Sequence, residues 1–196
     1  MLFLNSDTDN DDTIYVKELT EKFEKLECFL NSIEIISRRN SKSLSPLFYD
    51  LIGIEELNNQ RTMIVCIHEN IGELSLKKQL KIVAVGEAFS EVVNCPYLDF
   101  EITRQAIDQK YSSCKILWIE SQDIHKGHGS LLLNNLILYI KSRYRSISDI
   151  HGDLVAEERP TKQAHAERLE SFYRQNGFKV SWKNTDKISG SITIQV

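Results

Sequence analysis

The sequence contains no C-x-x-C pair and no apolar run of membrane-spanning length. Its four cysteines are widely spaced, at Cys28, Cys66, Cys95 and Cys114. Isolated thiols within apolar runs behave as small hydrophobic side chains, so we expect reduced core residues. The opening Met-Leu-Phe-Leu lacks a basic flank and is too short for a signal-peptide core. We therefore expect a cytoplasmic protein with no membrane partner.

A strong excess of one charge is also missing. The formal net charge is −4, so no global positive field would draw the protein to nucleic acid. The only basic groups of note are Arg38-Arg39 and Lys141 to Arg145. Hydrophobic residues make up 41% of the chain and charged residues 27%, which excludes the composition of a disordered chain. We expect a folded globular protein for which nucleic acid is not a partner.

The chain begins with an acidic segment, residues 1–12, followed by a helical pattern from Thr13 to Asn40. Apolar residues recur there at the three-and-four spacing of one helix face: Val16, Leu19, Phe23, Leu26, Leu30 and Ile33. Packing of this stripe on the protein's own sheet is the favoured interpretation. A coiled-coil homodimer is the alternative.

The middle of the chain changes to strand patterns. Leu47–Leu57 is interpreted as a short second helix, whereas Thr62–His68, Leu80–Val85 and Cys114–Glu120 are short β-branched runs typical of buried strands. Ser90–Ser113 is interpreted as a loop plus a short helix that shapes the substrate site.

The last third of the chain alternates between helices and strands. A buried helix is predicted at Ser130–Tyr144, a strand at Ile150–Ala156, and a helix from Pro160-Thr161 that ends at Asn176-Gly177. A hairpin of Phe178–Trp182 and Ser191–Val196 follows. These patterns predict an α/β fold: one central mixed, twisted sheet of about six to seven strands, flanked by helices and preceded by two amino-terminal helices.

The most informative segment is Trp118–Leu133, in which a strand runs through His125-Lys126-Gly127-His128-Gly129-Ser130 into a helix. Glycines let a backbone approach a ligand closely, and the first N–H groups of a helix attract phosphate. The spacing fits neither a Walker loop nor G-x-G-x-x-G. A plain tight turn is the alternative interpretation.

A second segment, Leu169–Phe178, places Phe172 and Tyr173 near a helix end that Gly177 closes. By itself this pattern is explained by core packing beside a glycine cap. A tyrosine hydroxyl in contact with water could also protonate a leaving thiolate.

Together the two segments resemble the GNAT family of acyltransferases. Gly127 and Gly129 match the glycines of its Arg/Gln-x-x-Gly-x-Gly/Ala motif, and Phe172, Tyr173, Gly177 and Phe178 match its Phe-Tyr-x-x-x-Gly-Phe motif. The resemblance implies one GNAT-like acyltransferase domain over residues 13–196. It also implies acetyl-CoA as co-substrate and an amine as acceptor, either on a small molecule or as a protein amino group.

The resemblance also implies site residues. Those expected at the coenzyme are Ile119, Ser121, Ile124, His125, Lys126, Gly127, His128, Gly129 and Ser130, with Tyr173 as general acid and Glu120 as candidate base. Ile124 departs from the family's Arg/Gln, so backbone N–H groups would hold the pyrophosphate, with Lys126 adding a point charge. His125 and His128 are interpreted as exposed loop residues, because no third ligand is spaced to join them at a metal.

Two alternative functions remain open at this point. The first is a catalytically degenerate GNAT-fold module that binds acyl-CoA and acts through protein contacts, which Ile124 and the lack of an obvious base favour. The second is action on aminoacyl-tRNA, for which the acidic composition gives little electrostatic support.

Overall fold

The structure, a computed structural model, describes residues 47–57, 60–69, 75–86, 95–108, 110–121, 127–156 and 162–196. By its contacts the chain divides into two compact units, residues 1–44 and 45–196, and every described element belongs to the second. The predicted acidic segment and the predicted helix from Thr13 lie outside the described residues. Both stay predictions, as does the domain boundary at residue 13.

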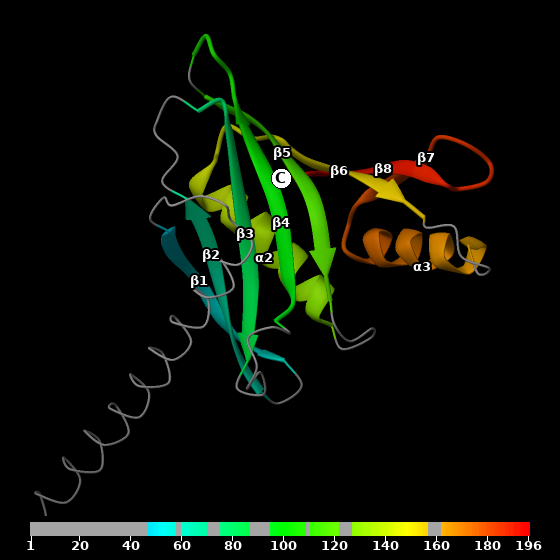
Figure 1. Ribbon diagram of the computed structural model, residues 1–196, viewed down its shortest axis with the longest axis horizontal. Helices are drawn as coiled ribbons and strands as arrows, with labels where there is room; N and C mark the ends of the chain where they lie inside the picture. The colour runs from blue at the N-terminus through cyan, green and yellow to red at the C-terminus, as the bar shows by residue number, and fades with distance from the viewer. Residues whose placement is uncertain are drawn as a thin grey trace, which may run out of the picture. The chain divides into compact units, whose positions relative to one another are not determined.

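The described elements form one sheet with two helices (Figure 1). In chain order they are β1 (Leu47–Leu57), β2 (Gln60–Glu69), β3 (Lys77–Gly86), β4 (Tyr97–Arg104), β5 (Tyr111–Glu120), α2 (His128–Arg143), β6 (Asp149–Val155), α3 (Lys162–Gln175), β7 (Lys179–Trp182) and β8 (Ser189–Gln195).

The sheet is mixed, with the strand order β1-β2-β3-β4-β5-β6-β8-β7. Neighbouring strands are antiparallel except β5 and β6, which are parallel and are connected through α2. A parallel pair needs such a crossover, because no tight turn can join the end of one strand to the start of its parallel neighbour. Within the described part of the chain, neither helix is long and apolar enough to cross a membrane.

The prediction of a second amino-terminal helix over Leu47–Leu57 is wrong, because this segment is the edge strand β1. It pairs with β2 from Leu47 opposite Glu69 to Leu57 opposite Gln60, with a bulge between Leu51 and Gly53. Its leucines and glutamates favour a helix in isolation. The ladder offered by β2 overrides that preference, as tertiary context commonly does.

The prediction of a loop plus helix over Ser90–Ser113 is wrong where it covers β4. Buried Leu98, Phe100 and Ile102 alternate there with polar neighbours, which is the period of a strand with one buried face. Pro96 directly precedes the strand, where a missing N–H does not interrupt the ladder. With β1 and β4 added, the described sheet has eight strands instead of six to seven.

Within the described residues, the other predicted strands and helices are confirmed in type and approximate position. β2, β3, β5 and β6 lie where β-branched runs predict them, and β7 pairs with β8 as the predicted hairpin. The glycine cap of α3 is also confirmed, since Gly177 has a φ of +84° and Phe178 N–H donates to the carbonyl of Tyr173 at 2.9 Å.

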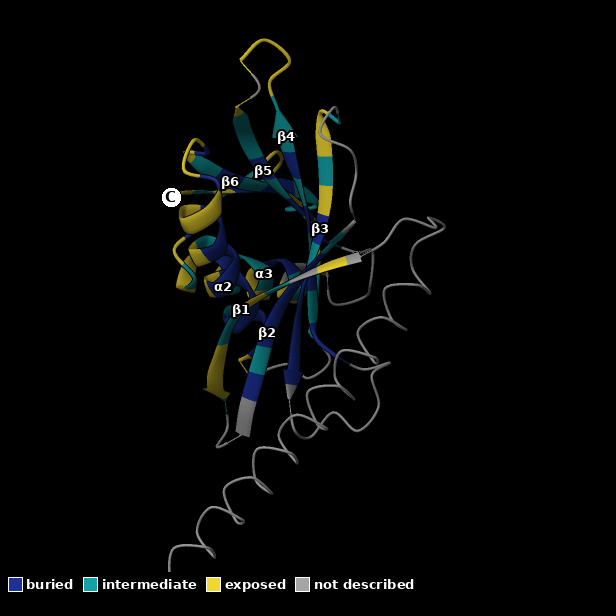
Figure 2. Cartoon of the chain, turned by 90° about the vertical axis from the view of Figure 1, so that its left-hand side faces the viewer, coloured by how far each residue is buried: buried dark blue, intermediate teal, exposed yellow. Residues whose placement is uncertain are grey.

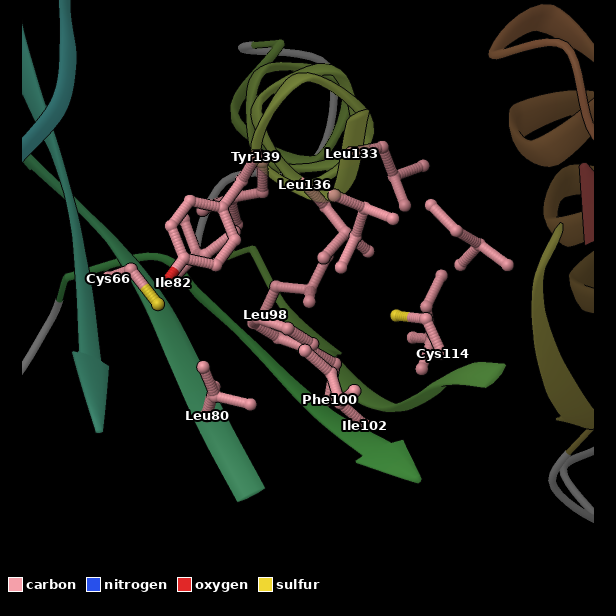
Figure 3. Packing of buried hydrophobic residues seen from close by; sticks show 14 of the residues in the cluster. Cys66, Leu80, Ile82, Leu98, Phe100, Ile102, Cys114, Leu133, Leu136 and Tyr139 are labelled. Atoms are coloured by element: carbon pink, nitrogen blue, oxygen red, sulfur yellow. The ribbon is translucent and has the colours of Figure 1, made fainter. Parts of the chain in front are cut away.

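The core lies between the sheet and α2. In Figure 2 the face of α2 toward the strands is buried, and Figure 3 shows Leu133, Leu136 and Tyr139 reaching from the helix to side chains of the strands. Leu132, Leu133, Leu136 and Ile140 are fully buried. Burial of each such side chain contributes roughly 1.5–3 kcal/mol, so this face fixes the helix, and with it the start of α2, on the sheet.

The described cysteines are core residues, as predicted. Cys66, Cys95 and Cys114 are free and buried, and burial raises the pKa of each thiol, to about 12, about 11 and about 12 respectively. These thiols are therefore protonated at neutral pH and are poor nucleophiles.

Candidate active site

β5 and β6 are the one pair of adjacent parallel strands in the described sheet, and α2 connects them. The two strands pair over three positions only, Cys114 with Ile150 through Ile116 with Gly152, and diverge beyond them (Figure 1). The last four residues of β5, Leu117–Glu120, thus extend past their pairing with β6. In open sheets, the carboxyl ends of parallel strands at a crossover are where ligands bind.

α2 begins beside this point without a side-chain cap. Gly127 is its N-cap residue with a φ of +81°, no side chain caps the helix, and the first turn contains no acidic residue. Leu131 N–H donates to the carbonyl of Gly127 at 3.0 Å. The first N–H groups of a helix have no carbonyl partner four residues earlier within the helix, and the positive end of its dipole attracts an anion.

The structure describes four of the seven predicted loop residues: Gly127, His128, Gly129 and Ser130 lie together at the start of α2. Ile124, His125 and Lys126 lie outside the described residues. The prediction that His128 is exposed is wrong, because its exposed fraction is 8%. It lies one turn before Leu131 and Leu132 on the buried face of the helix, and it is buried with them.

Gly129 has a packing role that sequence reasoning missed. A Cβ at this position would lie 2.9 Å from Cζ and 3.0 Å from Cε2 of Phe172 on α3. Only a residue without a side chain lets the aromatic ring approach the first turn of α2 this closely. The two motifs that carry the family resemblance therefore touch each other in the fold.

Tyr173, the predicted general acid, is mostly buried. Its exposed fraction is 8%, and its ring packs edge-on between Phe172 and Phe178, with centroid distances of 5.0 Å and 5.8 Å. Burial raises the pKa of the phenol to about 12. The hydroxyl is thus protonated at any physiological pH, but it is a weak acid.

Glu120, the candidate base, ends β5 on the sheet face that points away from α2. Its Oε2 accepts a hydrogen bond from Trp118 Nε1 at 3.1 Å. Ile119, between them, packs against the core, and Ser121 follows the strand half-buried. A bulge sets this alternation, since Asp99 pairs with Trp118 while Phe100 pairs with Ile116, which leaves Leu117 as the extra residue.

Further polar and aromatic side chains adjoin Glu120. Tyr97 lies directly opposite it on β4, Asp99 lies opposite Trp118, and Lys81 on β3 lies opposite Asp99. The alternation of Tyr97-Leu-Asp-Phe-Glu101 was the available signal for this group, and it is lost once the segment is interpreted as loop and helix. Among the described residues, no group of three or more His, Cys, Asp or Glu side chains is arranged to hold a metal ion.

Comparisons with known proteins give a limited result. No protein-family model matches the sequence, and no curated protein matches it. Among solved structures, the chain is similar to a proposed acetyltransferase of the GNAT family from Desulfovibrio desulfuricans, at 12% identity and a TM-score of 0.40, over 60% of this chain and 67% of that one. It is also similar to a Bacillus subtilis acetyltransferase in complex with CoA, at 12% identity and a TM-score of 0.36, over 63% of this chain and 79% of that one.

Proposed function

We propose that this chain is an N-acyltransferase that transfers an acetyl group from acetyl-CoA to an amine. The observation that supports this most is the uncapped N-terminus of α2 beside the diverging ends of β5 and β6, with the aromatic end of α3 packed against it at Gly129. The helix terminus offers N–H donors to the pyrophosphate, and the end of β5 offers an unpaired strand edge to the extended pantetheine.

The proposed reaction is direct transfer. The neutral amine of the acceptor attacks the thioester carbonyl, a C–N bond forms, the C–S bond breaks, and the sulfur leaves with the electron pair. Glu120, directly or through water, accepts the proton that the nitrogen loses. Tyr173 donates a hydrogen bond to the sulfur as negative charge develops there. The acceptor is an amine-bearing small molecule or a protein amino group.

The coenzyme site is tested by placing a charge in the first turn of α2. Ser130→Asp adds a carboxylate where the pyrophosphate would bind, and an acidic residue in a first helical turn stabilises the helix. We therefore expect CoA affinity to fall at least about tenfold while the melting temperature is unchanged or higher. The isosteric neutral variant Ser130→Asn is the matched control, and isothermal titration calorimetry with CoA is the measurement.

Two results of that experiment would contradict the site. Equal CoA affinity in Ser130→Asp, Ser130→Asn and the parent protein would show that the anion binds elsewhere. A loss of affinity accompanied by a lower melting temperature would show damage to the helix. Ile124→Arg, which restores the family's basic residue, should keep or tighten CoA binding.

A second candidate is a catalytically degenerate GNAT-fold module that binds acyl-CoA and acts through protein contacts. The 8% exposed fraction of Tyr173 favours it, because a general acid needs access to the leaving group. Turnover separates the two candidates. Release of free thiol from acetyl-CoA in the presence of a panel of amines supports the transferase, whereas CoA binding without thiol release supports the module.

A further inference from the structure

Four side chains at the start of β4 and the end of β5 form what we call the aromatic–carboxylate patch: Tyr97, Asp99, Trp118 and Glu120. Tyr97 lies opposite Glu120 and Asp99 lies opposite Trp118 in the antiparallel register. Each ring therefore has a carboxylate residue directly across from it and another two positions along its own strand. Directly opposed side chains in such a ladder are within contact distance, so the four make one continuous surface.

The patch faces away from α2. Leu98 and Phe100, which alternate with Tyr97 and Asp99, belong to the core beneath the helix, and Cys114 and Ile116 do so on β5. Successive side chains of a strand point to opposite faces, and the bulge at Leu117 shifts this alternation on β5, so that Ile119 faces the core while Trp118 and Glu120 do not. The patch therefore occupies the other face of the sheet. On β5 it begins at Trp118, two residues after Ile116, which is the last residue of β5 paired with β6.

An ammonium group already lies on one half of the patch. Lys81, from the neighbouring strand β3 (Figure 1), places its Nζ 4.0 Å from the centroid of the Tyr97 ring and 3.3 Å from Asp99 Oδ1. This is a cation–π contact combined with an ion pair. Tyr97 and Asp99 are thus arranged to bind an alkylammonium cation.

The other half of the patch has the same chemistry and is open. Trp118 is 54% exposed. Its Nε1–H donates a hydrogen bond to Glu120 Oε2 at 3.1 Å, which fixes the indole beside the carboxylate. Indole is the best cation–π partner among the aromatic side chains. Burial, together with the charges of Asp99 and Glu120, raises the pKa of Tyr97, so the phenol stays neutral and its ring remains a good acceptor for a cation.

We propose that the aromatic–carboxylate patch binds a protonated amine of the acceptor, and that the acceptor therefore carries at least two amino groups. This inference rests on the proposed acyl transfer. An attacking amine must be neutral, whereas the patch recognises a charged one, so the two roles need two nitrogens in one molecule. The bound ammonium lies over Trp118 beside Glu120. The second amine extends toward the point where β5 and β6 diverge, and Glu120 accepts its proton through water.

Binding is measured without any acyl donor, through the fluorescence of Trp118. The probe is 1,5-diaminopentane, with 1,5-pentanediol as the uncharged control. Trp118→Phe gives the background signal, because the fluorescence of that variant comes from Trp182, the one tryptophan that remains. We expect a saturable change with the diamine only. The affinity for the diamine should fall at least about fivefold in Glu120→Gln and in Asp99→Asn. It should also fall when salt is added.

Lys81 gives the sharpest test. If its ammonium competes for Tyr97 and Asp99, Lys81→Met should tighten diamine binding about three- to tenfold. Lys77→Met removes an equal charge from the same strand, where Lys77 pairs with Glu101 at 2.9 Å outside the patch, and should change the affinity less than twofold. Equal tightening in both variants would overturn the patch, because net charge would then explain the result.

The experiment separates the patch from the transferase proposal. No saturable signal in the parent protein or in Lys81→Met overturns the patch, whether or not thiol is released from acetyl-CoA. Diamine binding without thiol release from acetyl-CoA supports the patch as an ammonium site and overturns the transferase. Binding with release that is faster for the diamine than for 1-aminopentane supports both.

Discussion

The contact between Gly129 and Phe172 joins the two segments that matter most for the proposed site. The aromatic ring lies so close to the first turn of α2 that a Cβ at residue 129 would be 2.9 Å from it. Any side chain at residue 129 therefore acts first on the packing of α3. A loss of CoA binding in a bulky variant such as Gly129→Val would not by itself locate the pyrophosphate.

We expect Gly129→Ala to destabilise the protein by roughly 1–3 kcal/mol, because the ring must move to admit the methyl group. Phe172→Leu alone should also cost stability, through lost burial. In the double variant the two losses should be clearly less than additive, since the smaller side chain makes room for the alanine. Urea unfolding of the four proteins measures the coupling, and strict additivity would show that the contact does not constrain residue 129.

The burial of Tyr173 limits what its hydroxyl can do. Its pKa of about 12 exceeds that of an ordinary thiol, about 8.5, so complete proton transfer to a thiolate would be uphill by about 5 kcal/mol. A hydrogen bond to the charged sulfur costs no such transfer and is worth about 1.5–3 kcal/mol. The proposed role is therefore that of a hydrogen-bond donor to the leaving group.

Tyr173→Phe should lower turnover about 10- to 100-fold, because it removes the hydroxyl and keeps the ring between Phe172 and Phe178. CoA affinity and melting temperature should change little. Tyr173→Ala should lower stability as well, by roughly 3–5 kcal/mol for loss of a large buried ring. Wild-type turnover in the phenylalanine variant would reduce the role of Tyr173 to packing.

At the scale of elements, one carboxylate attaches α3 to the terminal hairpin. Glu170 accepts hydrogen bonds from Lys187 Nζ at 2.8 Å, Trp182 Nε1 at 2.9 Å and Arg174 Nε at 3.0 Å. The hydrogen bonds from Lys187 and Trp182 hold the pKa of Glu170 down, at about 2. Since this value lies below that of an unfolded glutamate, ionised Glu170 stabilises the folded state.

The contribution of Glu170 should be complete above about pH 4.5 and should disappear as the pH falls toward 2, because protonation then removes the charge in both states. Glu170→Gln should accordingly lower the free energy of unfolding by about 1–2 kcal/mol at pH 7, with a difference that shrinks below pH 4.5. Glu56→Gln, on an exposed part of β1, is the control. If the difference in the free energy of unfolding did not depend on pH, the substitution would act through a change in packing and not through the loss of charge.

Helices and strands with a strong hydrophobic period could be predicted from the sequence. A strand that forms only because it pairs with a neighbouring strand could not. β2, β3 and α2 have β-branched or leucine-rich patterns that few other structures satisfy. β1 has the composition of a helix and becomes a strand only because β2 lies beside it. β4 does have a strand period, but Pro96 and the loop residues before it obscure that pattern.

For the site, the glycine loop and the aromatic motif could be located from the sequence because turn and cap chemistry is local. Gly127 and Gly177 both have the positive φ that such signals indicate. The contact of Gly129 with Phe172 and the patch around Trp118 could not be predicted, because each depends on residues brought together across strands or helices. Register and packing, which a single sequence does not encode locally, decide both.

At the scale of the whole molecule, the edge strand β1 is bound to α2 by buried polar contacts as well as by its ladder. Tyr139, 4% exposed, donates its hydroxyl to Asp50 Oδ2 at 2.9 Å. Asn135, 1% exposed, donates its side-chain amide to Glu55 Oε1 at 2.7 Å. Ile52 and Leu57 of the same strand pack against the core. Removal of β1 would thus uncover the core and leave two buried polar groups of α2 without these partners.

We therefore expect residues 61–196 alone to fail to fold, whereas residues 45–196, the compact unit that retains β1, should fold and unfold cooperatively. A typical intramolecular hydrogen bond contributes about 0.5–1.5 kcal/mol, and a typical domain has only about 5–15 kcal/mol of stability in total. The loss of two buried hydrogen bonds, of a whole strand ladder and of its apolar contacts is enough to remove the native state. Amide dispersion in NMR spectra and urea unfolding of both fragments, beside the full chain, provide the measurement. A well-dispersed spectrum for residues 61–196 would show that β1 is dispensable, and failure of residues 45–196 would show that folding needs residues 1–44.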